Sequence, residues 1–111
     1  MKTITRTELQ NRLGSIVLLE ALPRNYFEAE HLPGARNMPR DEIDALASLL
    51  VPDKGAAVVT YCAGPSCPNS KIAAERLETL GYTEVYAYEG GKEEWLAAGL
   101  PFEQGLSDTA A

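Results

Sequence analysis

The residues of this 111-residue chain best suited to covalent chemistry are its two cysteines, Cys62 and Cys67. A cysteine thiolate is a nucleophile and a redox centre, but unpaired cysteine is also often buried as a small apolar side chain. Two cysteines and one distant histidine, His31, do not make a structural zinc site, so no metal is expected. The local sequence must therefore distinguish a catalytic, a redox-active and a merely buried cysteine.

Cys62 lies between a predicted strand and a predicted helix. The continuous run AAVVTY at 56–61 is typical of a strand buried on both faces, and apolar residues recur at helical spacing over 70–80. The segment between them is rich in Gly, Pro, Ser and Asn, which predicts a loop. This candidate substrate-binding loop consists of Ala63, Gly64, Pro65, Ser66, Cys67, Pro68, Asn69 and Ser70.

The loop and the start of the following helix predict an anion cradle around the Cys62 sulfur. The first amide groups of a helix lack internal acceptors, and the helix dipole favours negative charge at that end. A thiol placed there is stabilised as the thiolate, and a sulfur atom attached to it would be held by the same amides. Cys62 is thus the candidate catalytic residue. His31 is expected instead to hold its Pro-Gly turn through hydrogen bonds.

The rest of the sequence predicts short strands that alternate with helices. Thr5 and Glu8 have the spacing of a capping box, and Asp41 is expected to cap a later helix. Strands are expected over 16–19, 35–38, 56–61 and 84–88, and helices over 5–13, after 24, over 41–50, 70–80 and 92–98. This order indicates an α/β fold with a small, mostly parallel central sheet and helices on both faces.

Composition and charge narrow the class of protein. The formal charge of −6 argues against nucleic acid and membrane surfaces as partners. No apolar run is long enough to span a membrane, and Lys2, Arg6 and Arg12 interrupt the segment where a signal peptide needs its apolar core. Two cysteines five residues apart do not form the disulfide framework of a secreted domain. We therefore expect a cytoplasmic protein; the sequence does not indicate its oligomeric state.

Three separate segments resemble the rhodanese family, and together they extend over nearly the whole chain. YFEAEHLPGARNMP resembles the first signature, VVTYC with the loop and helix after it resembles the catalytic segment, and YEGGKEEWLAAGLP resembles the closing signature. The matching residues of the first signature are Tyr26 or Phe27, His31, Leu32, Pro33, Gly34, Ala35 and Pro39. Those of the closing signature are Gly90, Gly91, Trp95, Gly99 and Pro101.

The resemblance implies a single-domain sulfurtransferase of residues 1–103. The residues after it, 104–111, are expected to form a flexible tail because they end the chain. It places the transferable sulfur on Cys62 as a persulfide. The implied donor is thiosulfate or a persulfide delivered by a protein or a small molecule, and the implied acceptor is a thiol or cyanide. The resemblance implies no metal and no organic cofactor.

The sequence departs from the family pattern in three places. The loop contains no Arg or Lys and is about two residues longer than in many active members. The Asp-x-Arg pattern after the second strand is replaced by Glu20, Ala21 and Leu22. Cys67 lies within the loop, where it is either a resolving thiol for a Cys62 persulfide or a passively packed side chain.

These departures leave alternative functions open. A catalytically weak interaction module or a thiol-redox sensor that uses Cys62 and Cys67 would tolerate a loop without basic residues. Phosphatase or arsenate reductase chemistry is disfavoured, because those reactions need an arginine to hold the oxyanion, and this loop has none.

Overall fold

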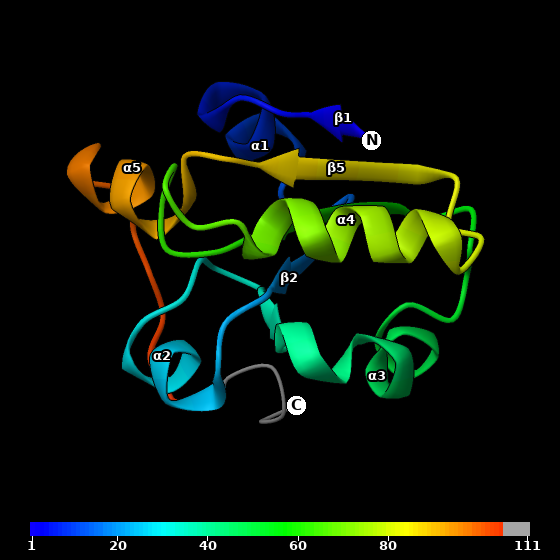
Figure 1. Ribbon diagram of the computed structural model, residues 1–111. Helices are drawn as coiled ribbons and strands as arrows, with labels where there is room; N and C mark the ends of the chain where they lie inside the picture. The colour runs from blue at the N-terminus through cyan, green and yellow to red at the C-terminus, as the bar shows by residue number, and fades with distance from the viewer. Residues whose placement is uncertain (106–111) are drawn as a thin grey trace.

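A parallel sheet forms the centre of the computed structural model, which describes residues 1–105 (Figure 1). The sheet has five strands in the order β1-β5-β4-β2-β3, and every neighbouring pair is parallel. The strands are Lys2–Thr3 (β1), Val17–Glu20 (β2), Arg36–Asn37 (β3), Ala57–Tyr61 (β4) and Glu84–Tyr88 (β5). The predicted α/β fold with a parallel central sheet is confirmed.

Helices cover both faces of this sheet. They are Arg6–Arg12 (α1), Arg24–Ala29 (α2), Ile43–Leu50 (α3), Asn69–Thr79 (α4) and Gly91–Ala97 (α5), with a 3-10 turn (η1) at Arg40–Glu42. Buried residues of α3 and α4 pack on one face, and α4 crosses in front of the sheet in Figure 1. Buried residues of α1, α2 and α5 pack on the opposite face.

The central strand β4 is buried on both faces, as its continuous apolar sequence predicted. Val58 contributes to the core beneath α3 and α4, whereas its neighbour Val59 contributes to the core beneath the other helices. Alternation of side chains along a strand explains this division. Trp95 of α5 is buried in the second core, and its indole N–H donates to the carbonyl oxygen of Pro101 at 2.8 Å.

Local signals in the sequence were partly correct. Thr5 and Glu8 form the predicted capping box, with each side chain accepting from the other residue's amide. The prediction that Asp41 caps a helix is wrong: Asp41 lies within the 3-10 turn, and the cap of α3 is Glu42, without a side-chain bond. β1 was not predicted from the sequence, because its exposed residues are defined by pairing with β5 and not by burial.

The carboxyl ends of the central strands meet at one edge of the sheet. Glu20 is in register with Tyr61, and Tyr61 with Tyr88, so the segments that follow β2, β4 and β5 all begin there. Figure 1 shows this edge on the left, where the loop before α4 lies beside α5.

The chain end described by the structure returns to α2. Gln104 and Gly105 donate to the carbonyl oxygens of Ala29 and Glu28. Residues 106–111 of the predicted flexible tail lie outside the described residues, so the boundary at 103/104 stays a prediction.

Candidate active site

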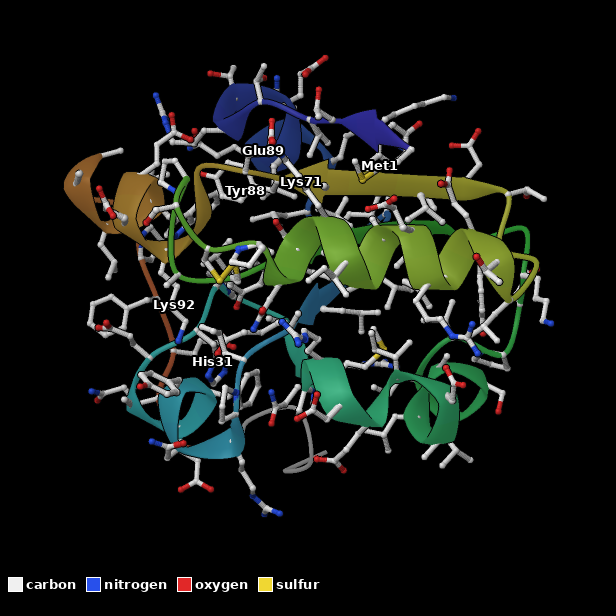
Figure 2. All side chains as sticks on the ribbon, in the orientation of Figure 1. Met1, His31, Lys71, Tyr88, Glu89 and Lys92 are labelled. Atoms are coloured by element: carbon white, nitrogen blue, oxygen red, sulfur yellow. A yellow bond between two sulfur atoms is a disulfide. The ribbon has the colours of Figure 1, made fainter. Side chains whose placement is uncertain are left out.

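The two cysteines meet at the carboxyl end of β4. Cys62 directly follows the strand and is only 1% exposed, whereas Cys67, further along the loop, is half-buried. Their sulfur atoms form a disulfide, drawn as the yellow bond in Figure 2, and their Cα atoms are 6.4 Å apart. The structure therefore shows the oxidised form of the site.

The start of α5 fixes the first turn of the loop. The amides of Lys92 and Glu93 donate to the carbonyl oxygens of Cys62 and Ala63, at 3.0 and 2.8 Å. Gly91 permits this approach: its φ is +62°, and a Cβ atom there would lie 2.5 Å from the Cys62 carbonyl oxygen. Because their carbonyl groups are bound on the α5 side, Cys62 and Ala63 are held in a fixed orientation.

The start of α4 supplies unoccupied donors near the cysteines. Pro68 precedes the helix and provides no side-chain cap. Within residues 1–105, the amides of Asn69, Ser70 and Lys71 have no protein acceptor. The Asn69 side chain donates to the carbonyl oxygen of Ala21 at 2.9 Å, which ties this helix end to the end of β2. The anion cradle predicted from the sequence needs free amides of this kind.

The predicted loop residues differ in exposure. Gly64 and Ser70 are buried and Asn69 is half-buried. The exposed positions are Ala63, Pro65, Ser66 and Pro68. The Cys67 amide donates to the Gly64 carbonyl oxygen at 3.0 Å, and this turn directs Cys67 back toward Cys62.

A buried polar cluster at the same sheet edge was missed by the sequence analysis. Glu20 is fully buried and accepts a hydrogen bond from the Tyr61 hydroxyl at 2.8 Å. Lys92 Nζ lies 2.9 Å from Glu20 Oε2 and donates to the Tyr26 carbonyl oxygen at 2.7 Å. Apart from this ion pair, Oε2 has no hydrogen-bond partner among the described residues. The cluster joins β2, β4 and α5 directly beneath the loop.

Burial governs protonation in this cluster. It raises the pKa of Glu20, against the opposing effects of Lys92 and Tyr61. Burial, reinforced by the Glu20 carboxylate, raises the pKa of Tyr61 well above its usual value. A charged residue at the end of the apolar strand VLLE was the signal for the acid. Its partner Lys92 lies far away in the sequence, so spacing alone could not find it.

His31 packs beside Phe27 and Glu103 and is not part of the cysteine loop. It is buried, its ring stacks on Phe27, and its Nδ1 donates to the Phe27 carbonyl oxygen at 2.8 Å. Its Nε2 lies 3.6 Å from Glu103 Oε1, which also accepts from the Gly34 amide. His31 and the Pro-Gly turn are therefore linked through Glu103.

Basic side chains lie at the α4 end of the loop, where Arg40 Nη1 donates to Asn69 Oδ1 at 3.4 Å. Lys71, the lysine nearest the loop in sequence, is paired with Glu89 at 2.7 Å, as Figure 2 shows. A cavity of about 330 Å³ lies beside Asn69. It is lined by Pro23, Arg24, Pro39, Arg40, Asp41, Glu42 and Asn69. Two guanidinium groups and two carboxylates thus share this cavity.

Neither a membrane helix nor a metal cluster is found in the part of the chain that the structure describes. No helix within residues 1–105 has the length and apolar character needed to cross a bilayer. In the same residues, no three His, Cys, Asp or Glu side chains gather as a metal site requires.

Comparison of this chain with known proteins finds one family model and several similar proteins. A family model described as a rhodanese-like domain matches residues 5–98. The protein YqhL of Bacillus subtilis is 33% identical over 95 residues, which cover 86% of this chain and 72% of YqhL.

Two further similar proteins are much longer than this chain. The HTH-type transcriptional regulator Rv0324 of Mycobacterium tuberculosis is 35% identical over 104 residues, covering 92% of this chain and 45% of the regulator. The crystal structure of a thiosulfate sulfurtransferase from Pseudomonas aeruginosa matches with a TM-score of 0.84 and 27% identity, over 95% of this chain and 20% of that one. This chain thus spans less than half of either protein.

Proposed function

This chain belongs to the rhodanese-like family, and we propose that it is a sulfurtransferase that carries sulfane sulfur on Cys62 as a persulfide. The observation that carries the proposal is the place of Cys62, where a buried central strand ends beside the uncapped start of α4. Similarity to a thiosulfate sulfurtransferase supports the reaction class.

The proposed reaction has two steps. In the reduced protein, the Cys62 thiolate attacks the sulfane sulfur of the donor, forms the new S–S bond and expels the donor's remaining group, which is sulfite when the donor is thiosulfate. An acceptor thiol or cyanide then attacks the outer sulfur and leaves Cys62 as the thiolate again. Amides at the start of α4 stabilise negative sulfur in both states.

The surroundings of the loop favour a donor that is recognised through its carrier and not through basic side chains of the loop. Lys71 is already paired with Glu89, and the loop itself has no basic side chain. We therefore propose a persulfide on a protein or a small molecule as the donor, with thiosulfate as the simple substitute for assay. We expect the reaction in the cytoplasm, where reducing conditions keep both cysteines available as thiols.

Mass spectrometry of the intact protein tests the persulfide directly. Reduced protein incubated with thiosulfate, or with an organic persulfide, should gain about 32 Da on Cys62 before any acceptor is added. The adduct is sought in a Cys67→Ser background, so that the second thiol cannot remove it. A Cys62→Ser variant with an unchanged circular dichroism spectrum is the control. Failure of every sulfane donor to load Cys62 would contradict the proposal.

A thiol-redox sensor is the second candidate, and the Cys62–Cys67 disulfide is the observation that favours it. Similarity to a transcriptional regulator is consistent with a sensing role. Under this hypothesis a mild oxidant forms the disulfide and changes the exposed surface of the loop, without sulfur transfer. A Cys67→Ser variant that responds to oxidant in the same way as the wild type would exclude it.

A further inference from the structure

Cys67 is placed to react with the inner sulfur of a Cys62 persulfide. The Cα atoms of the two residues are 6.4 Å apart, inside the range of about 4.4 to 6.8 Å that a disulfide requires. Their sulfur atoms are bonded in the structure, so the loop brings the second thiol to Sγ of Cys62 itself. The contact needs no rearrangement of the chain beyond this loop conformation.

Two features of the loop hold Cys67 in this position. The hydrogen bond from its amide to the Gly64 carbonyl oxygen closes a turn, and its own carbonyl oxygen lies 3.3 Å from the Cys62 sulfur. Cys62 is 1% exposed, whereas Cys67 is half-buried. Cys67 is therefore the thiol that already lies beside the inner sulfur.

The sulfur that is attacked decides the product. Attack on the outer sulfur would pass the sulfane atom to a new thiol. Attack on the inner sulfur expels the outer atom as hydrosulfide and leaves a disulfide between the two cysteines. The direct Sγ–Sγ bond in the structure corresponds to the second outcome.

We propose that Cys67 resolves the Cys62 persulfide, so that this domain releases its sulfane sulfur as sulfide. The Cys67 thiol loses its proton, forms a bond to Sγ of Cys62 and breaks the bond between that atom and the outer sulfur, which leaves as HS⁻. The sulfane sulfur gains two electrons and the two cysteine sulfurs lose them, so no external oxidant is consumed. A dithiol reductant then reopens the disulfide for the next cycle.

This inference rests on the proposed Cys62 persulfide, and one experiment separates the two. Reduced protein, freed of thiols, receives thiosulfate, and sulfite, sulfide and intact mass are followed together. An organic persulfide is the second donor, for which intact mass alone is read. Sulfite or a mass gain reports loading of Cys62, while sulfide formed from thiosulfate, together with a mass about 2 Da below the reduced protein, reports resolution by Cys67.

The wild type should form one sulfide for each sulfite and end as the disulfide. The Cys67→Ser and Cys67→Ala variants should form sulfite, keep a mass gain of about 32 Da and release no sulfide. The first-order rate of sulfide release should not depend on protein concentration, because both thiols belong to one molecule. Circular dichroism confirms that each variant is folded.

Two results would overturn the inference in different ways. If the Cys67 variants load and the wild type also keeps its added sulfur without sulfide release, Cys67 is not a resolving thiol and the sulfurtransferase proposal stands. If no variant loads from either donor, the proposed function itself fails, and the resolving reaction with it.

Discussion

At the scale of single residues, Glu20 is a buried acid beside the candidate site. Its carboxyl group is fully buried, receives one hydrogen bond from Tyr61 and faces Lys92. A buried ion pair costs desolvation energy that its mutual attraction only partly returns. Glu20 and Lys92 are therefore better understood as the residues that align β2 with α5 beneath Cys62 than as a source of net stability.

The raised pKa of Glu20 predicts a pH dependence of folding stability. A carboxyl group whose folded pKa lies above its unfolded value stabilises the fold fully at acid pH, and this contribution is lost as the pH rises through the folded pKa. The free energy of unfolding of the wild type, minus that of Glu20→Gln, should thus fall from about pH 4 upward. Urea unfolding at several pH values measures this difference.

Asp44 provides a control of opposite sign. Its hydrogen bond with Arg76 lowers the pKa of that carboxyl group, so its contribution is present at neutral pH and is lost as the pH falls. The free energy of unfolding of the wild type, minus that of Asp44→Asn, should therefore rise as the pH increases. A Glu20 curve that runs parallel to the Asp44 curve would contradict the burial argument.

Site residues were predictable where the chemistry is local in sequence. Cys62 and Cys67 were identified because they share one loop, and the structure joins them. Glu20, Tyr61 and Lys92 meet only through the order of strands in the sheet, which no single segment encodes. The sequence therefore indicated the two cysteines but not the polar groups beneath them.

At the scale of secondary structure elements, the first turn of α5 determines how the loop begins. The two hydrogen bonds from its amides to the carbonyl oxygens of Cys62 and Ala63 depend on close backbone contact at Gly91. Apolar periodicity predicted this helix to within one residue, because its buried face and its glycine boundaries are local features. The contact between this helix and the loop could not be predicted from the sequence, because it depends on the arrangement of the folded chain.

Gly91→Ala should be much more damaging than Gly99→Ala. Both glycines have positive φ, at +62° and +73°, so each substitution costs about 1 kcal/mol for the left-handed backbone. Only at Gly91 would the new Cβ meet backbone, whereas at Gly99 nothing lies within 4 Å. We expect a loss of about 2 to 4 kcal/mol in unfolding free energy at Gly91, with slower loading of Cys62.

Denaturant unfolding and sulfite release from thiosulfate measure these two effects. Gly99→Ala is the matched control, and it should keep the loading rate of the wild type. Equal losses of stability at the two positions would show that the close contact between α5 and the loop contributes nothing beyond the backbone conformation.

At the scale of the whole molecule, the net negative charge repels anions, whereas the proposed site stabilises one. The site is proposed to stabilise negative sulfur through main-chain amides, while the chain as a whole carries a formal charge of −6. The described part of the molecule measures 35 × 27 × 26 Å. At about 0.01 M salt the Debye length is about 30 Å, so nearly every charge acts on an approaching anion. At about 0.1 M it is about 10 Å, and only nearby groups remain effective.

The loading rate with thiosulfate should therefore rise when salt is added. Between about 0.01 and about 0.1 M potassium chloride, the repulsion of a dianion by the net negative charge is screened, and we expect the second-order rate of sulfite release to increase severalfold. An uncharged organic trisulfide, which passes one sulfur to Cys62 and leaves as the organic disulfide, should show almost no change when loading is followed by intact mass in the Cys67→Ser background. Glu93→Gln, which removes a carboxylate packed against Gly64, should raise the thiosulfate rate at low salt and leave the neutral donor unaffected. A thiosulfate rate that falls with salt would mean that Arg24 and Arg40, beside Asn69, attract the donor more strongly than the rest of the molecule repels it.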